Sequence, residues 1–232
     1  MTGLSSFFST FLPLGLSRCG SLVLAIAAGI IVVDPSKTSA QTLPLAENLT
    51  AYDTPQGEQL LMESTARDDF WKLSAQFLTQ ITQSYCGVAS AVMVLNSLKL
   101  PPPVDSRYQP YNVFTQENFF DNPKTTAVLP PQVVLRQGMT LAELGQLLVS
   151  HGAEVSVRPA ATTTLADFRR LAKENLAQPN NFVLINYYRQ AMGQEMGGHI
   201  SPLAAYHEAS DRFLILDVAR YKYPPVWVKA AD

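Results

Sequence analysis

The run from Gln80 to Asn96 constrains the fold more than any other part of the sequence, because it joins a cysteine to the start of an apolar helix. Apolar residues recur there at three- and four-residue spacing, at Val88, Ala91, Val92 and Leu95. This spacing predicts a helix over residues 87–98, with Cys86 in its first turn. The positive end of a helix dipole stabilises a thiolate, which is the reactive form of cysteine.

Gln80 lies six residues before the cysteine. Its side-chain amide can donate to an oxyanion that develops beside the Cys86 backbone N–H, a contribution of about 3 kcal/mol per donor in other enzymes. The alternative interpretation is that Cys86 is a small buried hydrophobe, as free cysteines usually are. The helix start and the spacing to Gln80 together favour a nucleophile.

A thiol nucleophile needs a base, and the chain has three histidines. His151 follows an apolar helical segment and precedes Gly152, so we interpret it as a helix C-terminal cap. His199 follows Gly197 and Gly198 at the predicted start of a strand, where glycines permit close backbone approach. His207 would lie on the same strand face as His199 only if the strand continues unbroken through Pro202. His199 is therefore the predicted base.

The imidazole of such a pair is usually oriented by a third side chain. Asp217 lies in the apolar, β-branched run 212–219. A buried carboxylate is costly unless it is paired. We therefore predict a Cys86–His199–Asp217 set with Gln80 as the oxyanion donor.

The remaining pattern predicts an α+β fold, with helices first and an antiparallel sheet second. Short helices are expected over 58–64 and 68–78, an amphipathic segment over 115–120, and helices over 140–150 and 164–178. Thr140 with Glu143 forms a capping-box pattern. A short strand is expected over 155–158, and the sheet strands over 182–187, 199–206 and 213–218.

Composition limits the partners. The formal net charge is −2 and charged residues make up 16% of the chain, with no basic patch. Nucleic acid and anionic membrane surfaces therefore have no electrostatic basis for binding. Only one cysteine follows residue 40, which excludes an internal disulfide after leader removal and leaves too few ligands for structural zinc. We expect no required cofactor and no metal ligands.

Several stretches together resemble the phytochelatin synthase family, in its short, single-domain bacterial form. The matching stretches are residues 80–96, Gly197–Pro202 with Tyr206 and His207, Leu216–Val228, Phe70 and Trp71 with Phe77, and Phe182–Tyr187. The Asp-Val-Ala-Arg-Tyr-Lys-Tyr-Pro-Pro run from Asp217 is far more specific than a cysteine–histidine pair. The resemblance covers about residues 55–232.

The resemblance implies a papain-like fold and a glutathione γ-glutamylcysteinyltransferase. Cys86 would attack the carbonyl between the cysteine and glycine of glutathione, releasing glycine and leaving a thioester. Water or a second glutathione would then take the acyl group, and we expect hydrolysis to dominate. Glutathione and its thiolate complexes with cadmium or zinc are the implied substrates, and a homodimer stays open.

Four further residues are weaker candidates for substrate binding. Asn186 and Gly198 flank a glycine-containing loop, and Arg220 and Tyr221 follow the orienting aspartate. Function-bearing side chains often lie on such loops. A turn or a solvated strand end explains the same residues equally well.

Two departures from the family pattern bear on substrate and metal. Plant and yeast relatives carry a cysteine-rich C-terminal region implicated in metal sensing, and its absence here puts strong metal dependence in doubt. The sequence also stops at Asp232, whereas relatives continue through a helix and an arginine-containing strand that helps hold the γ-glutamyl group. We therefore expect either a truncated sequence or an incomplete substrate pocket.

Residues 1–40 have the pattern of a signal peptide. Arg18 precedes an apolar run over 22–33, and small residues lead to Ala40. Twelve apolar residues suit a signal core and are short for a membrane span. We expect export to the periplasm, a mature N-terminal segment over 41–54 and a catalytic domain over 55–232. An uncleaved membrane anchor is the alternative.

Two other classes of function remain open from the sequence. One is a papain-clan peptidase that trims leader peptides at Gly-Gly sites, because the spacing from Gln80 to Cys86 is shared. The other is a non-catalytic secreted protein that binds thiols or a soft metal through Cys86 and the histidines.

Overall fold

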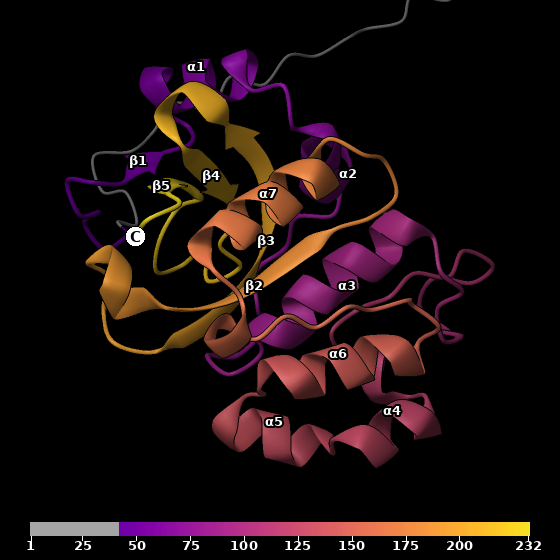
Figure 1. Cartoon of the computed structure of the whole chain (residues 1–232). Coiled ribbons are helices and arrows are strands. Elements are labelled where there is room, and N and C mark those ends of the chain that lie inside the picture. Colours follow the sequence, from indigo (N-terminus) through magenta and orange to yellow (C-terminus); the bar gives the residue numbers. More distant parts are fainter. Residues whose placement is uncertain (1–41) are drawn as a thin grey trace, which may run out of the picture. The chain divides into compact units, whose positions relative to one another are not determined.

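Helix α3 (Cys86–Leu98) is the centre of the fold in the computed structural model, which describes residues 42–232 (Figure 1). Eleven of its 13 residues are buried, as expected for a helix that is apolar on all sides. The predicted helix over 87–98 is confirmed, and Cys86 is its first residue. Lys99 ends the helix in a left-handed conformation, with φ of 57°.

Two shorter helices precede α3. Helix α1 (Pro55–Glu63) begins three residues before its predicted start, because the Thr54 side chain accepts from the Gly57 N–H and Pro55 suits the first turn. Helix α2 (Asp68–Ala75) begins as predicted and ends three residues early. The element order is therefore the predicted one, with shifted boundaries.

Helices α4 (Pro123–Val128), α5 (Pro131–Gln137) and α6 (Leu141–Ser150) lie together on the side of α3 away from the sheet (Figure 1). Sequence analysis missed α4 and α5, which are too short to show apolar periodicity. The predicted capping box of Thr140 and Glu143 is present at the start of α6. The predicted 115–120 segment contains the 3₁₀ turn η1 (Asn118–Phe120).

The sheet is antiparallel, in the order β1-β5-β4-β3-β2. Its strands are β1 (Thr50–Ala51), β2 (Val183–Tyr188), β3 (Gly198–His207), β4 (Arg212–Ile215) and β5 (Val226–Lys229). The 3₁₀ turns η3 (Arg189–Met192) and η4 (Glu208–Ser210) follow β2 and β3, and η2 (Ala160–Thr162) precedes α7. The predicted α+β class and antiparallel sheet are confirmed; four of the five strands follow the helices, as predicted, whereas β1 precedes them.

The two faces of the sheet carry different apolar clusters. One cluster joins α3 and α2 to Ile200, Ala204 and Leu214. The other joins α7 (Leu165–Leu176) to Leu203, Phe213 and Ile215. Since side chains of a strand alternate between faces, β3 and β4 are buried on both sides. Strand β3 carries the predicted histidine, and β4 leads to the predicted aspartate.

Two sequence expectations about strands need correction. Residues 155–158 form no strand, because this segment has no ladder partner among the described residues; Val157 instead packs over α6, where Gly145 leaves room for it. Strand β4 ends at Ile215, so Asp217 lies in the segment after it. The predicted strand over 199–206 is confirmed as β3, which continues through Pro202 to His207 with a register shift between Leu203 and Ala205.

Residues 42–54 are part of the same compact unit as the rest of the described chain. Strand β1 pairs with β5, and the Leu43 N–H donates to the Lys222 carbonyl at 2.9 Å. The predicted signal peptide lies outside the described residues. Among residues 42–232 no helix is both long and apolar enough to cross a membrane.

Candidate active site

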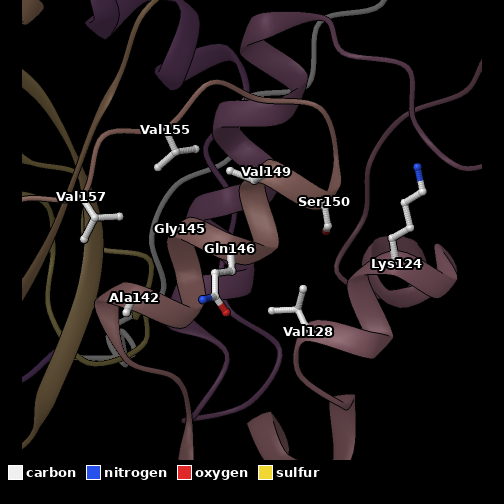
Figure 2. Close-up of a pocket in the computed structure, with 9 residues that line it drawn as sticks. All are labelled: Lys124, Val128, Ala142, Gly145, Gln146, Val149, Ser150, Val155 and Val157. Atoms are coloured by element: carbon white, nitrogen blue, oxygen red, sulfur yellow. The ribbon is translucent and has the colours of Figure 1, made fainter.

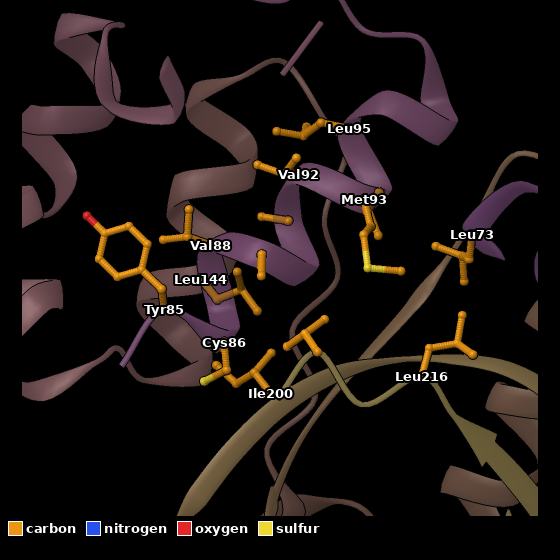
Figure 3. Packing of buried hydrophobic residues seen from close by; sticks show 14 of the residues in the cluster. Leu73, Tyr85, Cys86, Val88, Val92, Met93, Leu95, Leu144, Ile200 and Leu216 are labelled. Atoms are coloured by element: carbon orange, nitrogen blue, oxygen red, sulfur yellow. The ribbon is translucent and has the colours of Figure 1, made fainter. Parts of the chain in front are cut away.

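The Cys86 thiol lies at the N-terminal end of α3, beside Ile200 of β3 (Figure 3). The residue is 9% exposed. Ser90, one turn further along α3, donates to the Ile200 carbonyl at 3.1 Å and fastens the helix to the strand. The position of the thiol is therefore set by two buried elements that are far apart in the sequence.

His199, the second residue of β3, is 4% exposed. Its Nε2 lies 2.8 Å from Asp217 Oδ1. Because a carboxylate only accepts, Nε2 carries the proton, and Nδ1 is the ring nitrogen left for the cysteine. The Tyr187 ring packs edge-on against the imidazole, with 5.6 Å between ring centroids, and limits its rotation.

Cys86 and His199 change each other's ionisation. Burial raises the pKa of Cys86, but the hydrogen bond and charge of His199, with backbone hydrogen bonds at Ile200 and Gly87, outweigh it and lower the pKa. Burial lowers the pKa of His199, and hydrogen bonds to Asp217 and Cys86 outweigh it and raise the pKa. The two opposite shifts favour a thiolate–imidazolium pair.

Asp217 is fully buried and has several partners. Its Oδ1 accepts from His199 Nε2, from the Ala219 N–H at 2.8 Å and from Arg189 Nη2 at 2.9 Å. Burial would raise the pKa of this carboxyl, but the hydrogen bonds and charges of His199 and Arg189 hold it below its usual value. Asp217 is therefore a charged group that orients the imidazole.

Arg189 was missed by sequence analysis. It is the first residue of η3, directly after β2, and is 3% exposed. Its Nη1 lies 2.8 Å from Asp217 Oδ2, and the same nitrogen donates to Gln194 Oε1. The available signal in the sequence was an arginine directly after an aromatic strand end. An arginine buried at that place would need an acidic partner.

Gln80 is 3% exposed and its backbone is held on both sides. The Gln80 N–H donates to the Val218 carbonyl at 2.9 Å, one residue after Asp217. Gln116, also missed by sequence analysis, accepts from the Ile81 N–H at 3.0 Å and donates to the Thr79 carbonyl at 3.0 Å. The predicted oxyanion donor therefore lies in a segment fixed to the aspartate loop and to the segment just before η1.

The Gln80 side-chain amide is engaged in the structure. Its Nε2 donates to the Thr82 carbonyl at 2.7 Å and to the Tyr221 hydroxyl at 3.2 Å. The second bond is long and ends on a tyrosine that is 49% exposed. The bond to Tyr221 is therefore the weaker of the two bonds that the Gln80 amide makes.

The weaker candidates are dispersed around this centre. Gly198 directly precedes His199, and exposed Asn186 pairs across the sheet with Ile200, whose backbone bonds Cys86. Tyr221 contacts Gln80. The exposed Arg220 stacks its guanidinium over Phe77, at 4.9 Å from the ring centroid, and thus has a structural contact of its own.

The other two histidines have different partners. His151 caps α6, as predicted, and its Nε2 lies 3.2 Å from Thr125 Oγ1 in α4. His207 Nε2 lies 3.2 Å from Glu63 Oε2 and its Nδ1 lies 2.8 Å from Ser210 Oγ. Of the three histidines, only His199 is among the groups that shift the pKa of Cys86.

Two other features of the described chain lie outside this centre. An apolar groove of about 560 Å³ runs over α6, between α4 and Val155 and Val157 (Figure 2), and contains none of the predicted site residues. Within residues 42–232, no group of three or more histidine, cysteine, aspartate or glutamate side chains is arranged to hold a metal ion.

Comparison with known proteins identifies a family for this chain. The phytochelatin synthase family model matches residues 40–232. Glutathione gamma-glutamylcysteinyltransferase 3 of Lotus japonicus is 31% identical over 76% of this chain and 36% of its own length. Glutathione gamma-glutamylcysteinyltransferase 2 of Arabidopsis thaliana is 33% identical over 75% of this chain and 37% of its own length. The Schizosaccharomyces pombe glutathione gamma-glutamylcysteinyltransferase is 26% identical over 83% of this chain and 45% of its own length.

This chain thus spans less than half the length of each of these relatives. The matched part nevertheless includes the helix, the strands and the loop that carry the cysteine, histidine and aspartate described above. The chain belongs to the phytochelatin synthase family.

Proposed function

We propose that this protein is a cysteine-dependent transferase and hydrolase that releases glycine from glutathione through a thioester on Cys86. The observation that supports it most is the buried set in which His199 binds Asp217 at 2.8 Å and lowers the pKa of Cys86 through a hydrogen bond and its charge. The relatives named glutathione gamma-glutamylcysteinyltransferases supply the substrate class. The helical part followed by an antiparallel sheet supports a papain-like arrangement of the same groups.

In the first half of the reaction, the Cys86 thiolate attacks the carbonyl carbon of the cysteine–glycine bond. The carbonyl electron pair moves onto oxygen, where the Gln80 amide and the Cys86 backbone N–H are the proposed donors. When the tetrahedral intermediate collapses, the C–N bond breaks and imidazolium His199 gives its proton to the departing amine. Free glycine and a γ-glutamylcysteinyl thioester result.

In the second half, the neutral imidazole of His199 takes a proton from the acceptor, either water or the amine of a second glutathione. The acceptor attacks the thioester, and the Cys86 thiolate leaves. We propose water as the main acceptor, because it is far more concentrated than glutathione and a second peptide must be positioned to compete with it. γ-Glutamylcysteine is then the main product, with short phytochelatins at high glutathione.

The proposal extends to substrate form and location. We propose that no metal cofactor is required and that cadmium or zinc enters as a glutathione thiolate complex, because thiolates are the soft ligands that suit such metals. The pattern of residues 1–40 supports a signal peptide, and hence export to the periplasm. Expression of the full chain, followed by N-terminal sequencing of protein from the periplasmic fraction, tests this part.

Incubation of the full chain with glutathione, followed by mass spectrometry of products and of the Cys86 peptide, tests the reaction. We expect free glycine, γ-glutamylcysteine and an acyl group on Cys86, and no glycine from Cys86→Ser. His199→Ala should remove both halves of the reaction. Cleavage of Gly-Gly peptides without turnover of glutathione would identify a peptidase instead. Metal or thiol binding with no product would identify a binding protein.

Product chromatography with and without cadmium then fixes the acceptor. Long phytochelatins as the major, cadmium-dependent product would contradict the preference for water. The same measurement at increasing glutathione concentration should raise the share of short phytochelatins, because the second peptide then competes better with water.

A further inference from the structure

Four ionisable side chains form a chain of contacts in the interior. Cys86, His199, Asp217 and Arg189 are each at most 9% exposed. Hydrogen bonds and an ion pair join His199 to Asp217 and Asp217 to Arg189. His199 in turn lowers the pKa of Cys86 through a hydrogen bond and its charge. The reaction proposed above uses the first three groups and leaves a buried guanidinium unexplained.

The charges of this set suggest what the guanidinium does. With a thiolate and an imidazolium present, the four groups sum to zero. In the thioester, where Cys86 is uncharged and His199 is neutral, Asp217 and Arg189 still sum to zero. Without Arg189, both stages would leave one uncompensated negative charge in the interior, which is strongly unfavourable.

We propose that Arg189 is a positioning residue for the proposed reaction: it fixes Asp217 and remains its counter-ion when His199 is neutral. His199 can then both release and regain a proton without stranding a buried carboxylate. This inference depends on the proposed function for its role in catalysis. The effect of Arg189 on the titration of His199 can be measured without any turnover.

The surroundings of Arg189 support a positioning role over direct contact with substrate. Nη2 donates to Asp217 Oδ1, while Nη1 lies 2.8 Å from Asp217 Oδ2 and donates to Gln194 Oε1. The guanidinium carbon lies 5.2 Å from the centre of the Tyr223 ring and 6.0 Å from that of Tyr187. The planar fork is thus occupied by protein groups, as expected for an arginine that orients a carboxylate.

Other groups near His199 do not replace this counter-ion. Cys86 reaches it from α3, Asp217 from the loop after β4, and Tyr187 from β2. Burial raises the pKa of Tyr187 well above its usual value, so that this ring stays neutral. The positive charge of Arg189 opposes protonation of His199, whereas Asp217 promotes it. Loss of Arg189 should therefore make His199 hold its proton more tightly.

The test is an NMR titration of histidine-labelled full chain, in which only three histidines contribute signals. Arg189→Met should raise the His199 titration midpoint by about one pH unit, as expected for removal of a nearby charge. Arg189→Lys should stay close to the wild-type midpoint, because it keeps the charge. Arg169→Met is the matched control, since Arg169 makes a similar two-nitrogen contact with Asp211 at a separate site.

An unchanged His199 midpoint in folded Arg189→Met would overturn the proposal. So would a raised KM for glutathione without a midpoint shift, because that result would make Arg189 a substrate ligand. If Arg189→Met does not fold, the same substitution is compared in an Asp217→Asn background, where no carboxylate is stranded and the midpoint should again rise. Since the titration needs no glutathione turnover, a failure of the proposed function leaves it interpretable.

Discussion

Replacement of Asp217 by asparagine separates orientation of the imidazole from charge. In the Asp217→Asn variant, the side-chain oxygen can still accept from His199 Nε2 and from the Ala219 N–H, both at 2.8 Å in the wild type. The new amide nitrogen, however, would face Arg189 Nη1, which lies 2.8 Å from the present Oδ2. One donor would then meet another, and Arg189 and imidazolium His199 would lose their counter-ion.

Loss of a buried partner of this kind costs about 3 kcal/mol of folding free energy. Burial raises the pKa of Asp217, but the bonds to His199 and Arg189 outweigh burial. The pKa of Asp217 therefore lies below its usual value. The stabilising effect of the charged carboxylate is therefore fully present above the unfolded-state pKa of about 4, and it is lost as pH falls through the lower folded-state pKa. The difference between wild type and Asp217→Asn should be complete at pH 7 and shrink below about pH 4.

Urea denaturation at pH 7 and again below about pH 4 measures this difference in the free energy of unfolding. Asp211→Asn is the control, because Asp211 binds Arg169 similarly but is 38% exposed, and it should cost less than about 1 kcal/mol. Asp217→Asn should also retain part of the glycine-releasing activity, with its pH optimum moved downward, since Arg189 alone now acts on His199. Full stability at pH 7, or total loss of activity equal to that of folded His199→Ala, would refute the reasoning.

Three further substitutions test the Gln80 segment and the packing of α1. Gln116→Leu should lower kcat for glycine release about tenfold with little change in KM, because the Gln80 segment loses two hydrogen bonds; an unchanged kcat would contradict this. Tyr221→Phe should keep activity within about threefold, since it removes one weak bond to Gln80, and a hundredfold loss would give the hydroxyl a direct role. Gly57→Ala should lower the free energy of unfolding by about 3 kcal/mol, because its Cβ would collide with the Ala51 backbone oxygen; a thermal melt within a degree or two of wild type would disprove the collision.

Local patterns predicted much of the structure. Helix α3 follows from apolar spacing alone, and the start of α6 follows from Thr140 and Glu143, because periodicity and capping act within one turn of a helix. The same reasoning placed Cys86 at a helix start. The pairing of His199 with Asp217 was predicted from the cost of burying a lone carboxylate, and their 2.8 Å contact agrees with it.

Other features were decided by contacts between distant segments. Residues 155–158 have a strand-like composition but no ladder partner among the described residues, and the two-residue strand β1 exists because β5 lies beside it. Composition cannot reveal either outcome, since a strand is stabilised by hydrogen bonds to its neighbour. Helices α4 and α5 depend in the same way on packing against other segments.

The sequence by itself determined which residues could react: a cysteine at a helix start, a histidine after two glycines and an aspartate in an apolar run. Only the tertiary structure decided what completes them, by bringing Arg189 from the end of β2 to Asp217 and Gln116 from near η1 to the Gln80 segment. The physical reason is that buried charges and backbone groups take their partners wherever the fold places them in space. The separation of two residues in the sequence does not indicate whether the fold makes them partners.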